Sequence, residues 1–387
     1  MKHILTPEMK QDLLQRGFSR RSFGRFATLM TAGAALPFYN EGALAQGLSA
    51  MRGPIPEDAV KINANENPLG PCPEAAEAIY GVVKKGGRYL YEETFAFTKL
   101  QADLEGLKPN YVVPFAGSSA PLHQAVMAFT SPERPLVMAD PGYEAADRAA
   151  KFVGAKSIKV PLTKEFGHDV RAMVKASPTA GVIYICNPNN PTGTLTPRAD
   201  IEYVLANKPA GSILLLDEAY IHLLGKDMVT GSDLVAADKD IIILRTFSKL
   251  YGMAGLRAGA AFGRPDLLAK MTPYGAGALP VTGMVGGIAS LKVSSRLVPE
   301  RAKIIGDIRD DVSSWLTSKN ISFVPSISNK IMIDVKRPGQ EVIEAMFKEK
   351  VLIGRVWPAW PTHVRVSIGT AEEMEKFKTA FAKVMGV

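Results

Sequence analysis

The stretch Ser212-Ile213-Leu214-Leu215-Leu216-Asp217-Glu218-Ala219-Tyr220 joins an apolar run to a polar cluster and is the best guide to the fold. Apolar residues that do not alternate with polar ones indicate a strand buried on both faces of a sheet, here over 212–216. Similar runs alternate with helix-like segments along the chain. Further strands are predicted over 111–115, 136–139, 181–186, 241–244 and 258–262, and helices over 121–129 and 144–152. This alternation predicts an α/β fold, a mainly parallel sheet covered by helices.

The pattern of apolar residues changes after Met284 and indicates a smaller α+β domain. Its predicted elements are helices over 297–318 and 340–349 and strands over 331–335 and 364–367. The segment 60–73 is rich in Asn and Pro, so we expect it to contain no regular element and to lie as an arm across another surface. The expected organisation is a leader over 1–45, an N-terminal arm over 46–87, a large domain over 88–284 and a small domain over 285–387.

Composition excludes several classes of protein. The 387 residues are 47% hydrophobic, enough for a large core. Residues 1–45 carry six basic and three acidic side chains, so +3 of the formal net charge of +8 lies there and +5 in the rest, a modest excess that favours anionic small ligands over DNA. The two cysteines and five histidines show no metal-ligand spacing, and no G-x-S-x-G motif supports a serine hydrolase. Cys186 reads as a buried free thiol, with a disulfide to Cys72 as the alternative.

The N-terminal segment resembles an export signal. Ser19-Arg20-Arg21-Ser22-Phe23-Gly24-Arg25 is similar to a twin-arginine motif, a mildly apolar stretch follows over 26–38, and Ala43-Leu44-Ala45 supplies a small-x-small cleavage site. These features predict export by the twin-arginine route and a periplasmic mature protein beginning near Gln46. The alternative is an amphipathic helix with a chance Arg-Arg pair. The apolar stretch is too short for a stable membrane span.

Lys249 and Asp217 are the leading candidates for a reactive site. Asp217 follows the strand over 212–216, and Lys249 follows the strand over 241–244. In an α/β sheet, ligands lie at the carboxyl ends of the strands. A lysine amine there can bond to a cofactor aldehyde, and a carboxylate beneath an aromatic ring keeps the ring nitrogen protonated. This pair can therefore hold pyridoxal phosphate, although Asp217 alone also reads as an acid in a turn.

Three further polar features follow predicted strands. Gly117-Ser118-Ser119 precedes a helix, so its amides and hydroxyls can cradle a phosphate at the positive end of that helix, or simply cap it. Asn190 lies in a rigid turn, Pro188 to Gly193, and can donate its amide to a phenolate oxygen. Arg257 offers a planar fork for a phosphate, or reads as a surface arginine.

Together these motifs and their order resemble the class I/II aminotransferases of pyridoxal phosphate fold type I, within them the histidinol-phosphate aminotransferase branch. The supporting blocks are Asn63 to Pro68, Arg88-Tyr89, Cys186 to Gly193, Asp217 to Tyr220, Thr246 to Lys249 and Arg365 to Thr370. The resemblance covers almost everything from Lys61 to the C-terminus. It implies pyridoxal 5′-phosphate as cofactor, a homodimer with sites at the subunit interface, and amino-group transfer to a 2-oxo acid. We expect a donor with an aromatic, imidazole or acidic side chain.

The resemblance also implies a role for each matching residue. Lys249 would bond to the cofactor and shuttle a proton, and Asp217 would pair with the ring nitrogen. Arg365 would clamp the substrate α-carboxylate. The other implied roles are the phenolate oxygen for Asn190 and Tyr220, ring stacking for Tyr143, the phosphate for Gly117, Ser118, Ser119, Thr246, Arg257 and the neighbouring subunit's Tyr89, and substrate binding for Arg355 and Asn67.

The chain departs from the family pattern in two places. Arg355 lines up with the arginine that grips the distal phosphate of the substrate, but it is followed by an aromatic loop, Val356 to Pro361. The tryptophans of this loop, near a substrate-facing arginine, either stack on an aromatic or guanidinium side chain or pack under the small domain. Tyr89 is followed by Leu90, where the family usually has proline.

Two alternative functions remain open on the sequence alone. The same cofactor frame supports decarboxylation, β-elimination, racemisation or oxygen-dependent oxidation, and a non-catalytic cofactor-binding sensor is the alternative of another class. Because histidine biosynthesis is cytoplasmic, periplasmic export would indicate a substrate other than one from that pathway.

Overall fold

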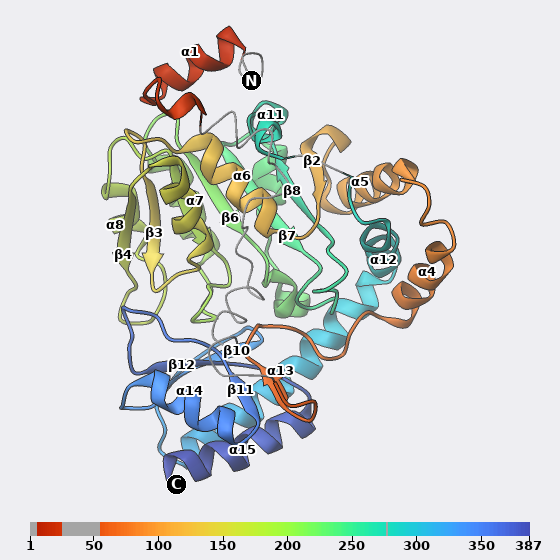
Figure 1. Ribbon diagram of the computed structural model, residues 1–387, viewed down its shortest axis with the longest axis vertical. Coiled ribbons are helices and arrows are strands. Elements are labelled where there is room, and N and C mark those ends of the chain that lie inside the picture. Colours follow the sequence, from red (N-terminus) through yellow and green to blue (C-terminus); the bar gives the residue numbers. More distant parts are fainter. Residues whose placement is uncertain (1–5, 25–54, 276–277) are drawn as a thin grey trace.

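The larger part of the molecule is built on a seven-stranded sheet (Figure 1). The computed structural model describes residues 6–24, 55–275 and 278–387. The strand order is β2-β8-β7-β6-β5-β3-β4, and all neighbours are parallel except β8, which is antiparallel to both β7 and β2. The strands are β2 (Val112–Phe115), β3 (Leu136–Asp140), β4 (Ser157–Pro161), β5 (Val182–Cys186), β6 (Ile213–Asp217), β7 (Ile241–Thr246) and β8 (Gly259–Gly263).

The central strands are buried on both faces, which explains their unbroken apolar runs. Every residue of β5, β6 and β7 is buried. Helices cover the sheet. In one of them, α6, every residue from Pro121 to Phe129 is buried. These helices are α6 (Ser119–Phe129), α7 (Ala145–Val153), α8 (Val170–Lys175), α9 (Arg198–Asn207), α10 (Ser232–Ala236) and α11 (Pro265–Met271), with 3-10 turns η1 (Pro109–Tyr111), η2 (Ile221–Asp227) and η3 (Thr272–Tyr274).

A group of three helices lies beside the sheet, at the right of Figure 1. The group consists of α4 (Pro73–Val83), α5 (Tyr91–Glu105) and α12 (Val281–Lys292). Two glycines of α12 allow the three helices to pack closely. Gly286 lies against Ile79 of α4, and Gly287 lies against the ring of Phe97 of α5. The border that we predicted between residues 284 and 285 therefore falls inside α12, a helix that packs on the large domain.

The C-terminal part forms a second layer below the sheet in Figure 1. Its elements are α13 (Ser294–Ser318), β9 (Phe323–Val324), β10 (Lys330–Asp334), α14 (Gly339–Lys348), β11 (Val351–Ile353), β12 (His363–Ser367) and α15 (Ala371–Met385). β12, β10 and β9 form an antiparallel sheet in which Arg365 lies opposite Met332. Thr370 and Glu373 form a capping box at the start of α15, which fixes where this helix begins.

The prediction that residues 60–73 contain no regular element is wrong at its start. Val60–Ile62 forms β1, which pairs in parallel with β11 of the C-terminal part. Val60 and Ile62 are buried while Lys61 is exposed. Three residues are too few to show this alternation as a pattern, and the partner strand lies about three hundred residues further along the chain. The strand ties the arm to the small sheet.

Residues 6–24 lie on the large domain, at the top of Figure 1. α1 (Pro7–Gln15) is capped by Thr6, and Leu13 is buried. Arg16 donates to the carbonyl oxygens of Met127 (2.9 Å) and Thr130 (3.1 Å), at the C-terminal end of α6. Residues 25–45 of the predicted leader lie outside the described residues. None of the described helices is long and apolar enough to span a membrane.

Both cysteines are free and buried, as the sequence indicated for Cys186. Cys72 directly precedes α4, and Cys186 ends β5. Within the described ranges, no cluster of three or more His, Cys, Asp or Glu side chains offers a metal site.

Candidate active site

A cavity of about 190 Å³ lies at the carboxyl ends of the central strands. β5, β6 and β7 run parallel, with Cys186 opposite Asp217 and Asp217 opposite Leu244, so polar residues that follow each strand meet at one edge. Nine of the predicted site residues line this cavity: Ser118, Ser119, Tyr143, Asn190, Asp217, Tyr220, Thr246, Lys249 and Arg257. The structure thus brings together residues from six separate segments of the chain.

Asp217 is held as a hydrogen-bond acceptor at the floor of the cavity. Its side chain is 2% exposed and accepts from the Tyr184 hydroxyl (3.0 Å) and from the backbone N–H of Ala219 (3.1 Å). Burial raises the pKa of Asp217 to about 6, against the lowering effects of these two hydrogen bonds and of Lys249. A cationic ring nitrogen placed against this carboxylate would oppose the effect of burial. Tyr184, on β5, is a partner that the sequence reasoning missed.

Lys249 projects into the same cavity from the turn after β7. It is buried, and its Nζ donates to the carbonyl oxygen of Asn65 at 3.0 Å. Asn65 also donates from Nδ2 to the Tyr220 hydroxyl (2.9 Å) and from its backbone N–H to Ser367 Oγ (2.8 Å). Asn65 therefore connects three parts of the site, although sequence reasoning gave it no role. The left-handed backbone at Asn65, with φ of 52°, allows this arrangement.

A second buried lysine lies beside the predicted cofactor residues. Lys330, at the start of β10, has no exposed surface, and its Nζ lies 3.2 Å from the centre of the Tyr220 ring. The same Nζ donates to Ser328 Oγ at 2.8 Å. A cation over an aromatic face is an attractive contact, so Lys330 fixes the Tyr220 ring from the small domain. The sequence contained no signal for this residue, because its neighbours in β10 are ordinary core residues.

Arg365 fixes the orientation of Asn190. Its side chain is fully buried, and it donates from Nη1 to Asn190 Oδ1 (3.0 Å) and from Nη2 to the Asn63 carbonyl (2.8 Å). Because arginine has only donors, the oxygen of the Asn190 amide must face Arg365. The Asn190 N–H group is then directed away from Arg365, as required for a donor to a phenolate oxygen.

The turn before α6 is shaped for close approach of a ligand. Gly117 has φ of 87°, and a Cβ at this position would collide with the guanidinium of Arg257. Arg257 donates to the carbonyls of Ala116 (2.8 Å) and Ala254 (2.8 Å) and to Ser248 Oγ (3.2 Å). Ser118 and Ser119 start α6, so helix N–H groups, two hydroxyls and a guanidinium surround one corner. This donor set suits a phosphate. Ser248, which sequence reasoning missed, also lines the cavity.

Arg355 and the aromatic loop lie beside the cavity and do not line it. Arg355 Nη1 lies 2.6 Å from Oε1 of Glu144, the residue that follows Tyr143 in the chain. Trp357 is 1% exposed, donates from Nε1 to the Gly142 carbonyl (2.9 Å), and packs with Val324 and Met332. Trp357 thus packs in the small domain, and its ring also lies 4.6 Å from the Arg355 guanidinium carbon.

Five of the predicted site residues do not line this cavity: Gly117, Asn67, Tyr89, Arg355 and Arg365. Asn67 donates from Nδ2 to the Leu250 carbonyl (2.7 Å) and accepts from the Leu69 N–H (3.1 Å), so it joins the arm to the turn after Lys249. Tyr89 is 70% exposed and stacks on Tyr91. Leu90 stands where the family usually has proline, and its φ of 50° is one that proline cannot adopt. The backbone here therefore follows a different path from one that contains proline.

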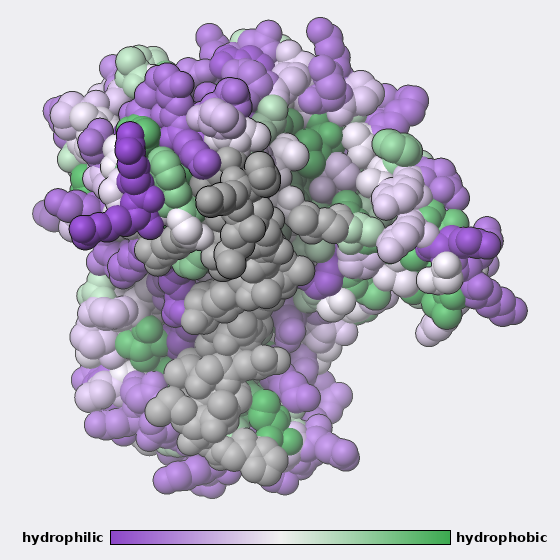
Figure 2. Space-filling model, turned by 45° about the horizontal axis from the view of Figure 1, so that its top comes forward, coloured by the Kyte–Doolittle hydropathy of each residue, from purple (hydrophilic) through white to green (hydrophobic). Residues whose placement is uncertain are grey.

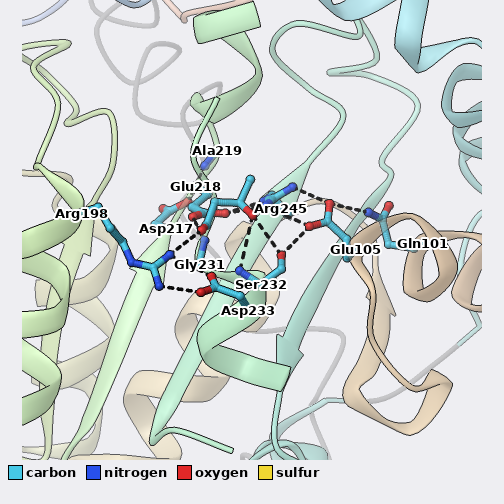
Figure 3. A network of polar contacts seen from close by, with 11 residues as sticks. Gln101, Glu105, Arg198, Asp217, Glu218, Ala219, Gly231, Ser232, Asp233 and Arg245 are labelled. Atoms are coloured by element: carbon cyan, nitrogen blue, oxygen red, sulfur yellow. Dashed lines mark hydrogen bonds and ion pairs between the residues drawn. The ribbon is translucent and has the colours of Figure 1, made fainter. Parts of the chain in front are cut away.

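An ionic network supports β6 and β7 from behind the cavity (Figure 3). Arg245, 1% exposed, pairs with Glu218 (2.6 Å) and with Glu105 (2.9 Å). Glu218 also accepts from the Gly231 N–H (2.9 Å), and Glu105 accepts from the Ser232 hydroxyl. Glu218 follows Asp217 and Arg245 lies four residues before Lys249. The network therefore fixes the strand ends that carry the two leading candidates.

The residues present fit a flat aromatic aldehyde that carries a phosphate. An amine, a buried carboxylate, an aromatic side chain and a phosphate-type corner all face one cavity. The glycine at 117 allows the Arg257 guanidinium to lie where the Cβ of any other residue would be. The individual roles of these residues stay predictions, which the variants described below are designed to test.

Comparison with known proteins agrees with this arrangement. The family model for aminotransferase class I and II matches residues 57–381. Histidinol-phosphate aminotransferase 1 of Nitrosococcus oceani is 34% identical over 326 residues, which is 82% of this chain and 87% of that protein. Histidinol-phosphate aminotransferase of Moorella thermoacetica is 30% identical over 343 residues, covering 85% of this chain and 86% of that protein.

Solved structures share the fold. A putative histidinol-phosphate aminotransferase from Erwinia carotovora atroseptica superposes with a TM-score of 0.80 at 30% identity, covering 86% of this chain and 98% of that one. Histidinol-phosphate aminotransferase from Sinorhizobium meliloti, solved in complex with pyridoxal-5′-phosphate, gives 0.78 at 23% identity, with 92% and 97% covered. The predicted fold class is confirmed.

Proposed function

This chain belongs to the class I and II aminotransferase family, as its motifs predicted, and on that basis we propose that it uses pyridoxal 5′-phosphate to move an amino group to a 2-oxo acid. The observation that supports the proposal is that Lys249 and Asp217 line one cavity with Arg257, whose guanidinium lies against Gly117 at the start of α6. These groups would hold the cofactor in any of its reactions, and the choice of amino transfer among them is supported by the aminotransferase relatives.

The proposed roles follow from the contacts of each residue. Bound pyridoxal phosphate supplies an aldehyde and an electron-accepting ring. Asp217 would hold a proton on the ring nitrogen, since its two hydrogen-bond donors stabilise the carboxylate. Lys249 would hold the cofactor through its Nζ, and the same Nζ would take up the proton from the donor's α-carbon. Its bond to the Asn65 carbonyl keeps Nζ within the cavity.

Arg365 is the proposed carboxylate clamp for both amino and oxo acids. It donates to the side-chain oxygen of Asn190 and to the Asn63 carbonyl, which are both neutral acceptors. A planar guanidinium binds a carboxylate through two parallel hydrogen bonds. The clamp would therefore orient the α-carbon, and Asn190 would couple this orientation to the cofactor.

Replacement of Lys249 by Ala tests the proposal. We expect the rate of amino transfer to fall by about a thousandfold or more. The absorption band at about 420 nm, which covalent attachment gives in this cofactor class, should also be lost. Borohydride reduction of the wild-type protein, followed by peptide mapping, should label Lys249. The matched control is Lys239→Ala, at an exposed lysine. A label on Lys330, or full activity in Lys249→Ala, would refute the assignment.

We also propose that the protein works as a homodimer. Tyr89 is directed to solvent and away from its own cavity, as expected for a residue that serves a neighbouring subunit. Large apolar side chains around it are exposed: Tyr80 (78%), Val83 (60%), Tyr91 (55%) and Phe95 (73%). In Figure 2, hydrophobic residues lie among polar ones on the projecting part of the molecule, where α4 and α5 lie. A second subunit would cover this surface.

Export by the twin-arginine route is the proposed reason for the N-terminal segment. The motif Ser19 to Arg25 supports it, and Arg20 and Arg21 are exposed on the folded chain. This route carries folded proteins, which suits an enzyme that must bind its cofactor before export. With Arg20 and Arg21 both replaced by Lys, we expect the protein to stay in the cytoplasm on cell fractionation, while Lys10→Arg should have no effect. An unchanged periplasmic fraction in the double variant would refute the proposal.

A further inference from the structure

Lys330 presents its amine to the face of the Tyr220 ring. Its Nζ lies 3.2 Å from the centre of that ring and donates to Ser328 Oγ at 2.8 Å. Lys330 has no exposed surface, and Tyr220 is 3% exposed. A cation at this distance, shielded from water, acts strongly on an aromatic ring. Tyr220 lines the cavity and Lys330 does not, so Lys330 can influence a ligand there only through its field or through another residue.

The strands β10 and β12 of the small domain set the second contact of Tyr220. Lys330 of β10 lies opposite Ser367 of β12. Ser367 Oγ donates to Asn65 Oδ1 at 3.1 Å, so the amide nitrogen of Asn65 faces Tyr220 and donates to its hydroxyl oxygen at 2.9 Å. A hydroxyl oxygen that accepts a hydrogen bond still has its own proton to donate to another group. Both contacts of Tyr220 therefore suit a hydroxyl that acts as a donor.

These two neighbours strengthen the Tyr220 hydroxyl as a donor. A positive charge at the ring stabilises negative charge that develops on the phenol oxygen, and an oxygen that accepts one hydrogen bond donates the next one more strongly. The resemblance assigns this hydroxyl to the phenolate oxygen of the cofactor. In pyridoxal phosphate that oxygen lies next to the aldehyde carbon, so its negative charge stabilises a proton on a nitrogen bonded there. A stronger donor to the phenolate oxygen weakens that stabilisation.

We propose that Lys330 is a positioning residue that acts through Tyr220: it strengthens the hydrogen bond from Tyr220 to the cofactor, so that the Lys249 nitrogen that holds the cofactor loses its proton at a lower pH. This inference rests on the proposed function. An amino donor arrives as an ammonium ion and must lose a proton before its nitrogen can react. An unprotonated Lys249 nitrogen can take up that proton, so Lys330 extends amino transfer to lower pH.

Other charged or titratable groups also face this part of the site. Lys249 Nζ lies 5.5 Å from the centre of the Tyr220 ring. Burial, together with the nearby Asp217, raises the pKa of Cys186 and of Tyr184, so both side chains stay neutral. The remaining groups are Glu66, Tyr143 and Arg257, which line the cavity, and Arg365, which donates to Asn190. All of them are retained when residue 330 alone is replaced, so a change in that variant comes from residue 330.

The pH dependence of the cofactor's absorption gives a measurement that needs no substrate. Loss of the proton from the nitrogen changes the band at about 420 nm, so titration of the loaded protein yields the pH midpoint of proton loss. Lys330→Met and Lys330→Gln remove the charge, and we expect each to raise the midpoint by about one unit or more, a tenfold change in proton affinity. Gln also keeps a group that can donate to Ser328, should the Met variant fold poorly.

Two further variants separate the charge from the packing of the side chain. Lys330→Arg keeps a cation at the ring and should bring the midpoint to within about 0.3 unit of the wild-type value. Lys239→Met makes the same change as Lys330→Met at an exposed position and should leave the midpoint unchanged.

The Tyr220→Phe background tests the route through the hydroxyl. Phenylalanine keeps the ring and removes the hydroxyl. In this background Lys330→Met should shift the midpoint by less than about half of the shift that it causes when Tyr220 is present. An equal shift in both backgrounds would show that the charge acts directly through space and would overturn the role given to Tyr220.

The inference is also overturned when both neutral variants keep the wild-type midpoint, when neither they nor the wild-type protein show a transition, or when Lys330→Arg has a midpoint as high as Lys330→Met. Failure of the proposed function looks different. In that case wild-type protein supplied with pyridoxal phosphate shows no such band, and borohydride attaches no cofactor to Lys249.

Discussion

Asp217 shows how the same burial that serves the bound cofactor costs stability without it. In the cofactor-free chain, desolvation raises the pKa of Asp217 to about 6, above the ordinary aspartate value of 3.8. A carboxyl with a raised pKa binds more protons in the folded state than in the unfolded state. Its contribution to stability is therefore most favourable below about pH 4 and is lost as the pH rises through about 6.

Asp217→Asn should consequently stabilise the cofactor-free protein at neutral pH. The amide cannot ionise, so we expect a gain in the free energy of unfolding of roughly 1–3 kcal/mol at about pH 7.5, shrinking toward zero near about pH 4. Urea denaturation at both pH values measures it. The loaded variant should lose most amino transfer, because its ring nitrogen lacks the carboxylate. An equal effect at both pH values would contradict the burial argument.

At the residue scale, the sequence predicted the site where each residue followed its own strand. Lys249, Asp217 and Asn190 were assignable because each comes just after an apolar run. Asn65 and Lys330 were missed because their roles depend on residues brought from far along the chain, 184 residues in the case of the Asn65–Lys249 contact. Asn67 was assigned and Asn65 was not, since a segment without periodicity does not reveal which asparagine contacts Lys249 and Tyr220.

At the element scale, Asp217 ends β6 and Lys249 follows β7, and Arg245 of β7 pairs with Glu218, directly after β6 (Figure 3). Arg245 lies between Glu218 and Glu105, all within a poorly solvated region. Such a group is stable only as a complete set, because each remaining charge would be buried without compensation.

Arg245→Met should therefore lower the free energy of unfolding by about 3–5 kcal/mol. Chemical denaturation measures this loss, and faster release of the cofactor should accompany it as the ends of β6 and β7 become less fixed. The triple change Glu105→Gln, Glu218→Gln and Arg245→Met removes all three charges and should recover most of the stability. Wild-type stability in the single variant would show that the network contributes little.

The strands were predictable where they were long and buried on both faces. β4 and β1 were missed for different reasons. β4 has only one fully buried residue, Val160, so its apolar run is broken by exposed positions. β1 has three residues and depends on β11 for its hydrogen bonds. Short or peripheral strands carry too little apolar pattern to be recognised before their partner is known.

At the scale of the whole molecule, the exposed aromatic side chains of α4 and α5 need a cover. Phe95→Glu places a charge at the most exposed phenylalanine of this surface, so we expect the dimer to dissociate about tenfold or more readily. Sedimentation or size-exclusion measurements over a concentration series report this. The control Val229→Glu makes a similar change at a residue 59% exposed on the large domain. A dimer of unchanged affinity would place the interface elsewhere.

The contacts of Asn65 also set the order of events during biosynthesis. Its N–H donates to Ser367 Oγ, 302 residues later, while its carbonyl accepts from Lys249. A nascent chain that has emerged only as far as the large domain holds the lysine and the acid but lacks Ser367 and Arg365. The contacts of Asn65 are therefore complete only after β12 has been synthesised, and a chain that ends before Ser367 lacks the contact with that residue.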